Sequence, residues 1–370
     1  MKPVIVITGT RPEIIKMAPV IRALRNRKIP TLFVHCGQHY SHYMSQQFID
    51  DLELPAPDYA FKVKVSSPGK QISRIIAQID RLMQKIDSSI VLVEGDTNTV
   101  LSAALAANKL RIPVGHIEAG LRSFDLRMPE EHNRRLTDHI SSLLFTPTQT
   151  TKKNLKKENT WGKIFVTGNT VIDAVNEHLT IAERKSQILS KINFKKYILA
   201  TAHRAENVDN ITVLKNFINV FAECPLPVVF PIHPRTEKRL RQNGLYSQFK
   251  KISNLQIMPP LGYLDFLVAM KNSEVILTDS GGIQEESTAP AVRKPVLVMR
   301  ISTERSEAVD AGFAKVVGTR KEKILSAINS VLEFRHELPV RSPFGDGHAA
   351  ERIAEITKKE TSVGLKCYCA

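Results

Sequence analysis

The sequence predicts an α/β protein with two doubly wound domains that face each other across a cleft. Three observations lead to this prediction. Short β-branched runs alternate with helical patterns along the whole chain, which is typical of parallel sheets with crossover helices. The chain has 370 residues, which is long for one hydrophobic core. The candidate strands also form two sets of similar size, and ligands of such sheets bind at the carboxyl ends of the strands.

The candidate strands are short, mostly apolar runs. In the first half they are residues 4–8, 31–35, 90–93, 114–117, 143–146 and 164–166. In the second half they are residues 197–200, 228–232, 255–258, 275–278, 296–299 and 315–317. Helical patterns lie between them. In residues 70–87, for example, Ile75, Ile79 and Leu82 fall on one helical face and are expected in the core.

The domain boundary is expected near Gly168-Asn169, just before a helix that begins around Val171. The first domain then spans residues 1–168 and the second spans 169–348. The loop at 342–347 can carry the chain back, so we expect a C-terminal helix within 349–370 to pack on the first domain.

The formal net charge of +15 fits either a nucleic acid or a polyanionic small substrate. The lysines are scattered along the chain and aromatic residues make up only 6%. Because no basic stripe with interleaved aromatics and no nucleic-acid-binding motif is present, we expect no nucleic-acid partner.

No apolar run is long enough to cross a bilayer, so no membrane partner is expected. The N-terminus, MKPVIVITGT, lacks the length and cleavage site of a signal peptide, which favours a cytoplasmic protein. Cys36 and Cys224 lie in or near apolar segments and are expected to be buried thiols. Cys367 and Cys369 are too closely spaced for the usual zinc patterns, so no metal site is expected.

Polar clusters follow several of the candidate strands. In TGTRPEIIK, Thr10 and Glu13 have the spacing of a capping box, and Pro12 suits the first turn of a helix. Arg11 and Lys16 then stand near a helix N-terminus, which favours an anion. A well-capped helix with solvated charges explains the same residues.

Two further clusters in the first half carry acids. Asp96 follows a strand and a glycine. Glu118 directly follows an apolar run, close to a buried strand end, where a carboxylate is costly unless it is paired or used. Glu130 and Glu131 lie further along the same polar stretch, which an ordinary surface loop also explains.

In the second half, His203 follows one strand and His233 ends another, and either can be a structural hydrogen-bonding residue. Ser280-Gly281-Gly282 separates a strand from a helix, so that its open N–H groups suit a phosphate. Glu286 lies in the first turns of that helix and can reach a ribose, while Arg305 can add positive charge. These residues suggest a nucleotide diphosphate on the second domain, although a glycine turn needed only for packing remains an alternative.

Together these stretches resemble the non-hydrolysing UDP-N-acetylglucosamine 2-epimerases. The matching segments occur in family order and span nearly the whole chain. They are GTRPEIIKMAP, GQHY, GDTNTVL, PVGHIEAGLRS, MPEEHNRRLTD, VTGNTVIDAV, TAHRAEN, PLGYLDF, LTDSGGIQEES, KPVLVMR, TERSEAV and PFGDGHAAERI. The resemblance implies a glycosyltransferase-B-like architecture of two Rossmann-like domains, a homodimer, and an active site in the cleft.

The activity that the resemblance implies is the reversible conversion of UDP-GlcNAc to UDP-ManNAc. It proceeds without a metal or nicotinamide cofactor, by elimination of UDP to 2-acetamidoglucal and re-addition. The resemblance assigns the catalytic acids to Asp96, Glu118 and Glu130, without deciding which is the base, and adds His203. The implied substrate-binding residues are Arg11, Lys16, Phe266 beside the uracil, Ser280, Gly281, Gly282, Glu286 and Arg305.

The chain departs from the family pattern at three places. It has His203-Arg204-Ala205-Glu206 where His-Arg-Arg-Glu is common. It carries a longer loop at 289–293 near the expected nucleotide. The GQHYSHYMSQQF region also differs from bacterial members in which a second UDP-GlcNAc activates the enzyme, so such activation is not expected here.

Four other functions remain open. The first is a related 2-epimerase that acts on a UDP-diacetamido-uronic acid, since the positive charge permits an extra carboxylate. The others are a hydrolysing epimerase, a glycosyltransferase of the same fold, and a nucleotide-sugar or nucleic-acid binder without turnover.

Overall fold

The computed structural model describes residues 2–37, 48–63, 67–334 and 337–365. Contacts between Cα atoms divide the chain into two compact units. The first unit is Met1–Ala174 with Gly345–Ala370, and the second is Val175–Phe344. The domain bounds expected from the sequence, 1–168 with the C-terminal helix and 169–348, stay a prediction that limited proteolysis can test.

The first unit contains a parallel, 7-stranded sheet among its described residues, in the order β3-β2-β1-β4-β5-β6-β7. Its strands are β1 (Val4–Thr8), β2 (Thr31–Gly37), β3 (Tyr59–Lys62), β4 (Ile90–Glu94), β5 (Val114–Ile117), β6 (Leu143–Thr146) and β7 (Lys163–Val166). The chain moves outward in one direction from β1 and in the other from β4. The pair β1–β4 is therefore the switch point, where ligands of such sheets bind.

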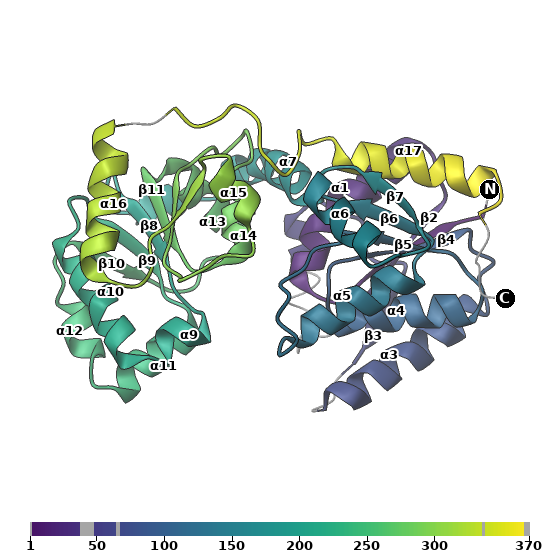
Figure 1. Ribbon diagram of the computed structural model, residues 1–370, viewed down its shortest axis with the longest axis horizontal. Helices are drawn as coiled ribbons and strands as arrows, with labels where there is room; N and C mark the ends of the chain where they lie inside the picture. The colour runs from purple at the N-terminus through teal and green to yellow at the C-terminus, as the bar shows by residue number, and fades with distance from the viewer. Residues whose placement is uncertain (1, 38–47, 64–66, 335–336, 366–370) are drawn as a thin grey trace. The chain divides into compact units, whose positions relative to one another are not determined.

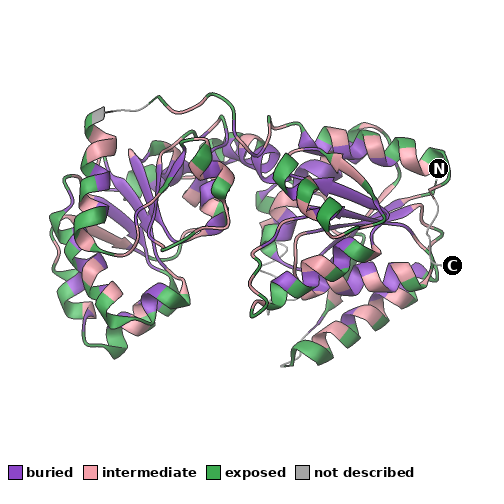
Figure 2. Ribbon diagram, viewed as in Figure 1, coloured by how far each residue is buried: buried purple, intermediate pink, exposed green. Residues whose placement is uncertain are grey.

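The helices of the first unit are α1 (Arg11–Asn26), α3 (Pro68–Met83), α4 (Asn98–Lys109), α5 (Pro129–Ile140), α6 (Gln149–Lys157) and α17 (Ala349–Ser362), together with the start of α7 (Thr170–Lys185). Helix α4 packs between α3 and α5, and α1 packs against α17 (Figure 1). Because helices cover both faces, β1 and β4 are fully buried, and they are apolar except for Thr8 and Glu94 at their ends. Figure 2 shows strands of this sheet in purple, the colour of buried residues.

The second unit contains a parallel, 6-stranded sheet among its described residues, in the order β10-β9-β8-β11-β12-β13. Its strands are β8 (Ile198–Thr201), β9 (Val228–Pro231), β10 (Leu255–Met258), β11 (Val275–Thr278), β12 (Val296–Val298) and β13 (Ala314–Val316). Strand β8 pairs with both β9 and β11, so the switch point of this sheet lies between β8 and β11.

The helices of the second unit include α10 and α16, which pack against each other over a core rich in phenylalanine. The set is the rest of α7 with α8 (Ile188–Lys191), α9 (Ala205–Val208), α10 (Ile211–Glu223), α11 (Pro234–Gln242), α12 (Tyr246–Lys250), α13 (Tyr263–Asn272), α14 (Gly281–Glu286), α15 (Ser306–Asp310) and α16 (Lys321–Phe334). Phe221, Phe230 and Phe249 form a triangle of aromatic contacts in this core.

The predicted fold class of two doubly wound α/β domains is confirmed, and each predicted strand is present within a residue or two of its expected bounds. One strand was missed. Among the described residues, strand β3 pairs with β2 alone, at the edge of its sheet, and its residues are largely exposed. The sequence YAFK after two prolines shows neither an apolar run nor a clear alternation, so the sequence gives no strand signal there.

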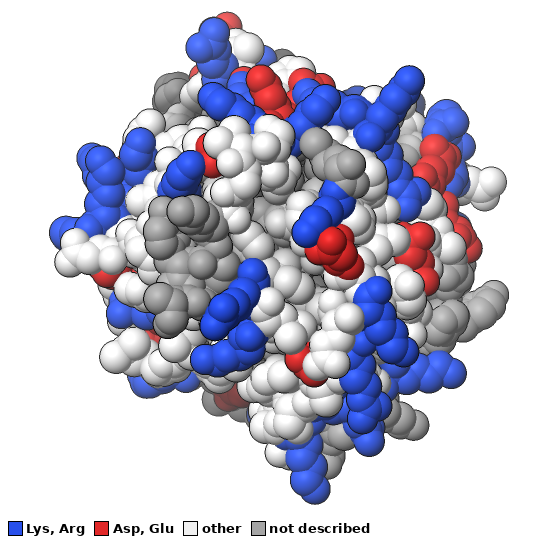
Figure 3. All heavy atoms as spheres, turned by 90° about the vertical axis from the view of Figure 1, so that its right-hand side faces the viewer, with Lys and Arg blue, Asp and Glu red and all other residues white. Residues whose placement is uncertain are grey.

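Three smaller expectations concern the thiols, the charge and the membrane. Cys36 and Cys224 are buried free thiols, as predicted. On the face in Figure 3, Lys and Arg side chains are scattered among acidic and uncharged ones rather than gathered in one patch. Among the described residues, no helix combines the length and apolar character that a membrane span requires. Cys367, Cys369 and most of the GQHYSHYMSQQF region lie outside the described residues.

Candidate active site

The first half-site lies at the switch point of the first unit. The carboxyl ends of β1, β4 and β5 bring together the turns that contain Gly9, Glu94 and Glu118. Gly9 allows α1 and α4 to approach closely, because a Cβ atom there would lie 2.1 Å from Thr99 Oγ1. The sequence therefore places a glycine where a side chain would push the turns apart.

Glu13 holds the β1–α1 turn, but not through the predicted capping box. Its carboxylate accepts hydrogen bonds from the Gly9 N–H at 2.7 Å and from the hydroxyls of Thr10 and Thr97, each at 2.8 Å. The Thr10 hydroxyl is thus bound to the Glu13 side chain instead of a backbone N–H, because Thr97 brings a neighbouring turn into contact with the same carboxylate. Burial raises the pKa of Glu13 to about 7, against these hydrogen bonds, which lower it.

This raised pKa predicts a pH dependence of stability. A carboxyl whose folded pKa exceeds its unfolded value stabilises most when protonated, so its contribution is present below about pH 4.5 and is lost as pH rises to about 7. The pKa difference of about 2.5 (7 minus 4.5) corresponds to about 3 kcal/mol. We expect the free energy of unfolding of the Glu13→Gln variant, relative to that of wild type, to rise by about 3 kcal/mol as the pH is raised from about 4.5 to about 7. Parallel pH profiles for the two proteins, obtained by chemical denaturation, would contradict the prediction.

Lys16 joins two acids in the centre of this half-site. Its ammonium lies 3.0 Å from Glu94 Oε1 and forms an ion pair with Glu118. Burial raises the pKa of Glu94 well above its usual range; the Lys16 charge opposes this, and the Glu118 charge adds to it. Glu118 was expected to need a partner at a buried strand end, and Lys16 is that partner. Glu118 also has a positive φ of 71°, a strained conformation of the kind that clusters at functional sites.

Asp96 is held by helix α5. Its carboxylate forms an ion pair with Arg134, and its backbone carbonyl accepts a hydrogen bond from Asn133 at 2.9 Å. One third of its side chain is exposed, so it is open to a ligand. The predicted site residues Asp96 and Glu118 thus lie at neighbouring strand ends of one sheet, and Lys16 reaches Glu118 from helix α1.

The adjacent acids Glu130 and Glu131 have different surroundings. Glu130 is exposed in the first turn of α5, whereas Glu131 is fully buried and forms ion pairs with Arg134 at 2.6 Å and Arg135 at 3.0 Å. Burial raises the pKa of Glu131, but hydrogen bonds from Ser123 and the two arginines outweigh this effect and lower the pKa to about 2. Glu131 supports Asp96 through Arg134, a role that sequence reasoning missed. Its spacing of three and four residues from the arginines is the signal that could have indicated it.

Arg11, the remaining predicted residue of this half-site, is the first residue of α1 and is exposed. Its guanidinium lies 5.6 Å from the centre of the Phe48 ring. That contact is compatible with a cation–π interaction and leaves the guanidinium at the helix N-terminus, where an anion is favoured.

The second half-site lies at the switch point of the second unit and is built on Asp279. This fully buried carboxylate accepts the backbone N–H groups of His203 (3.0 Å) and Arg204 (2.9 Å) and the side-chain amide of Asn207 (3.1 Å). It therefore fixes the turn after β8 against the end of β11. Sequence reasoning gave Asp279 no role, because its function is to bind a turn more than seventy residues away.

His203 is half-buried, and its Nδ1 lies 3.3 Å from Asp279 Oδ1. Burial lowers the pKa of His203, although the Asp279 charge opposes this shift. The His233 ring lies 5.4 Å away between ring centres, which brings the two predicted histidines together. A His203 ring that is neutral at physiological pH can donate or accept a hydrogen bond.

The Ser280-Gly281-Gly282 corner begins the short helix α14. A Cβ atom on Gly281 would lie 2.8 Å from Glu304 Oε1, so this glycine permits a close approach to its backbone. A Cβ atom on Gly282 would meet nothing within 4 Å, so packing alone does not require that glycine. The sequence also allowed a glycine turn that is needed only for packing. That explanation fits Gly281 but not Gly282.

Arg305 forms an ion pair with Glu285, at 2.7 Å between Nε and Oε1. The Glu285 side chain is only 1% exposed, so the pair is buried on the acid's side. Glu304, the preceding residue, pairs with Arg300 at 2.7 Å. The pair of Arg305 with Glu285 fixes the loop after β12 against α14. Sequence reasoning named the neighbouring Glu286 and gave Glu285 no role.

Glu286 and Phe266 are both half-buried, at the end of α14 and on α13. Burial raises the pKa of the Tyr263 hydroxyl, and the charge of Glu286 raises it further. Glu286 therefore lies near Tyr263, the first residue of α13. The lengthened 289–293 loop is anchored by the Arg293 side chain, whose Nε donates to the Pro339 carbonyl at 3.0 Å. In the second unit, the strand ends thus bring together His203, the serine–glycine corner and the Arg305 loop.

A family model described as UDP-N-acetylglucosamine 2-epimerase matches residues 22–358, which is most of the chain and includes strands from both sheets. The chain belongs to this family. The resemblance inferred from the sequence motifs is thereby confirmed, as is the assignment to the isomerases.

Individual relatives cover nearly the whole chain. The UDP-N-acetylglucosamine 2-epimerase of Methanocaldococcus jannaschii is 45% identical over 360 residues, which cover 95% of this chain and 97% of that protein. The solved structure of the enzyme from the same organism in complex with UDP-GlcNAc and UDP is 44% identical, with a TM-score of 0.83, and covers 97% of this chain and 100% of that chain. The UDP-2,3-diacetamido-2,3-dideoxy-D-glucuronate 2-epimerase of Pseudomonas aeruginosa is 36% identical over 367 residues, covering 96% of this chain and 99% of that protein.

Proposed function

We propose that the chain interconverts UDP-GlcNAc and UDP-ManNAc by inverting C2 of the sugar, without hydrolysing the nucleotide sugar. The observation that carries the proposal is the pair of acids Asp96 and Glu118 at the ends of neighbouring strands, each bound to a cation. Family membership supports it, as does the related archaeal enzyme solved with UDP-GlcNAc and UDP.

The reaction begins with elimination across C1–C2. A carboxylate takes the C2 proton, the electron pair forms the C1–C2 double bond of 2-acetamidoglucal, and the C1–oxygen bond breaks to release UDP. In the second step UDP adds back to C1 while a proton reaches C2 from the opposite face. Because the C2 proton is only weakly acidic, carboxylates are also needed to stabilise positive charge at C1, as in glycoside cleavage.

In this proposal Asp96, Glu118 and Glu130 supply the acid and base groups, and any one of the three can be the base at C2. Arg11, Lys16 and His203 contact the diphosphate or the sugar, and cations there stabilise the departing UDP. Lys16 has a second effect, because its ion pair with Glu118 holds that carboxylate in place at the strand end.

The second unit is proposed to hold the nucleotide. Ser280, Gly281 and Gly282 bind the phosphates, Glu286 the ribose, Phe266 the uracil face, and Arg305 the negative charge. The exposed backbone at Gly282 and the pairing of Arg305 with Glu285 support these roles.

Four further features belong to the same proposal. The reaction needs neither a metal nor a nicotinamide, the protein forms a homodimer, it acts in the cytoplasm where UDP-sugars are made, and the product supplies ManNAc-type sugars for surface polysaccharide or glycan synthesis. The expected absence of a metal is tested by adding a chelator, which should leave the rate unchanged.

The runner-up substrate is a UDP-2,3-diacetamido-uronic acid. The Pseudomonas relative named for that substrate and the net charge of +15, which suits an additional carboxylate, support it. The relatives named for UDP-N-acetylglucosamine are more similar to this chain, at 45% and 44% identity, and we therefore rank UDP-GlcNAc first.

The test is to start the reaction from both sides. Protein is incubated with UDP-GlcNAc alone and, separately, with UDP-ManNAc alone, and the nucleotide sugars are separated by chromatography. We expect both reactions to reach the same mixture with no loss of UDP-sugar. Progressive release of UDP would instead indicate a hydrolysing epimerase. A third incubation contains the UDP-2,3-diacetamido-uronic acid, and conversion of that substrate alone would indicate the runner-up. The Asp96→Asn variant serves as the control for contaminating activity.

A further inference from the structure

His116 lies on β5 and is completely buried between two hydrogen-bond acceptors. Its Nδ1 is 2.7 Å from Asp138 Oδ1 on α5, and its Nε2 is 2.8 Å from the backbone carbonyl oxygen of Gly95. Glu118 follows this histidine two positions later, and Gly95 immediately precedes Asp96. The ring therefore lies between the turns that carry the two proposed catalytic carboxylates.

The protonation of this ring follows from its partners. A carbonyl oxygen can only accept a hydrogen bond, so Nε2 must carry a proton. The other oxygen of Asp138, Oδ2, accepts the Gly120 N–H at 3.2 Å and lies 2.8 Å from Arg122 Nη2. A proton on Nδ1 that is donated to Asp138 Oδ1 fits this arrangement, in which the ring is doubly protonated.

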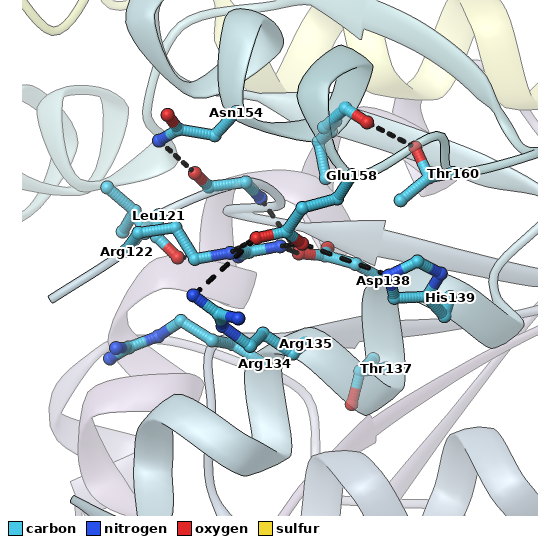
Figure 4. A network of polar contacts seen from close by, with 12 residues as sticks. Leu121, Arg122, Arg134, Arg135, Thr137, Asp138, His139, Asn154, Glu158 and Thr160 are labelled. Carbon is cyan, nitrogen blue, oxygen red and sulfur yellow. Dashed lines mark hydrogen bonds and ion pairs between the residues drawn. The ribbon is translucent and has the colours of Figure 1, made fainter. Parts of the chain in front are cut away.

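Two acids lie in this cluster. In Figure 4 the Arg122 side chain runs toward the carboxylates of Asp138 and Glu158, and its contacts with Glu158 are 2.9 and 2.6 Å. Glu158 also lies 3.7 Å from the partly exposed Arg135, and Asp138 is the acid that faces His116 directly. A buried charge is tolerable when it is paired and hydrogen-bonded in this way.

Asp138 is the common anchor of both catalytic turns. Through His116 it holds the Gly95 carbonyl, and directly it holds the Gly120 N–H, two residues after the strained Glu118. Asn154 binds the other side of Gly120, donating to its carbonyl at 3.0 Å. The positions of Asp96 and Glu118 relative to each other therefore depend on one buried carboxylate and one ring.

We propose that doubly protonated His116 and Asp138 are positioning residues that set the spacing of Asp96 and Glu118. They touch no substrate in this scheme and act only through the two turns. The expected fall in kcat on changing these residues rests on the proposed epimerase reaction. The protonation of the ring is independent of that reaction.

The first test measures the ring itself. In the full-length protein labelled with nitrogen-15 in histidine, we expect one histidine to show two protonated ring nitrogens, with signals absent from the His116→Asn variant. If the His116 signals include one unprotonated nitrogen, the proposal is overturned. This measurement requires no substrate, so it remains decisive even if the wild-type protein proves inactive, an outcome that would overturn the proposed function instead.

The second test uses two amides that mimic different halves of the imidazole. The Asn amide occupies the position of Nδ1, so His116→Asn keeps the Asp138 contact and loses the hold on Gly95. The Gln amide reaches the position of Nε2, so His116→Gln keeps the hold on Gly95. We expect kcat to fall by about 10²-fold in His116→Asn and by about tenfold in His116→Gln, with an unchanged Kd for UDP.

Asp138→Asn should lower kcat at least as much as His116→Asn, because it disturbs both turns. His139→Gln, a change at the next and exposed position of the same helix, is the matched control and should retain the wild-type rate. If Asp138→Asn does not fold, the two His116 variants decide the question by themselves. Equal rates in wild type and His116→Asn, or weaker UDP binding in both His116 variants, would overturn the proposal.

Discussion

The Asp96→Asn variant is expected to lose about 10³-fold in kcat while its Kd for UDP stays unchanged. Asn keeps the size of the side chain but removes the charge that would move the C2 proton or stabilise C1. The backbone carbonyl of residue 96 still accepts its hydrogen bond from Asn133, so the turn should keep its shape. Steady-state rates and UDP binding by calorimetry measure the two quantities separately.

Glu118→Gln should give a similar loss, since it removes the acid that pairs with Lys16 on the adjoining turn. The matched control is Asp125→Asn, which makes the same chemical change in an ion pair with a largely exposed arginine and should keep the wild-type rate. If either catalytic variant keeps a rate close to wild type, that carboxylate has no part in the mechanism.

Arg305→Ala is expected to destabilise the second unit by about 3 kcal/mol and to weaken UDP binding about 10²-fold. The loss of stability follows because Glu285 is left buried without its arginine. The loss of affinity follows if the same guanidinium contacts the diphosphate, since charge-assisted hydrogen bonds are among the strong ones. Chemical denaturation and calorimetry measure the two effects.

A double variant separates these effects. Glu285→Gln combined with Arg305→Ala removes the buried charge together with its partner, so most of the lost stability should return while UDP binding stays weak. If the double variant also binds UDP with wild-type affinity, Arg305 acts only as a structural partner of Glu285. The proposed contact between Arg305 and the diphosphate of the nucleotide would then be wrong.

The fold was predictable because its strands are short apolar runs and its helices show regular periodicity. Strand β1, with the sequence VIVIT, could hardly be anything but a buried strand. Strand β3 was not predictable, because an exposed edge strand needs little apolar pattern and takes its conformation from pairing with β2.

The candidate site was predictable only in part. Asp96 and Glu118 could be singled out because they follow apolar strands, and strand ends of a parallel sheet meet at one edge. Lys16 could be singled out because it lies near a helix N-terminus, where an anion is favoured. Asp138 and His116 could not, because their importance comes from hydrogen bonds between separate elements. A single sequence also gives no indication that Glu131 is buried while Glu130 beside it is exposed.

The capping box shows the same limit on a smaller scale. Thr10 and Glu13 have the expected spacing, yet Thr97 reaches the Glu13 carboxylate from another turn and the two residues bind each other differently. Local patterns therefore predicted which residues matter at the β1–α1 turn, while tertiary contacts decided what they do.

Proton NMR of the protein with UDP-GlcNAc in D2O tests the central claim most directly. The proposed mechanism predicts that UDP-ManNAc appears with deuterium at C2, with no metal or nicotinamide supplied, because the proton removed from C2 exchanges with solvent before one is returned. UDP-ManNAc that keeps its original C2 proton, or a spectrum that does not change, would contradict the claim.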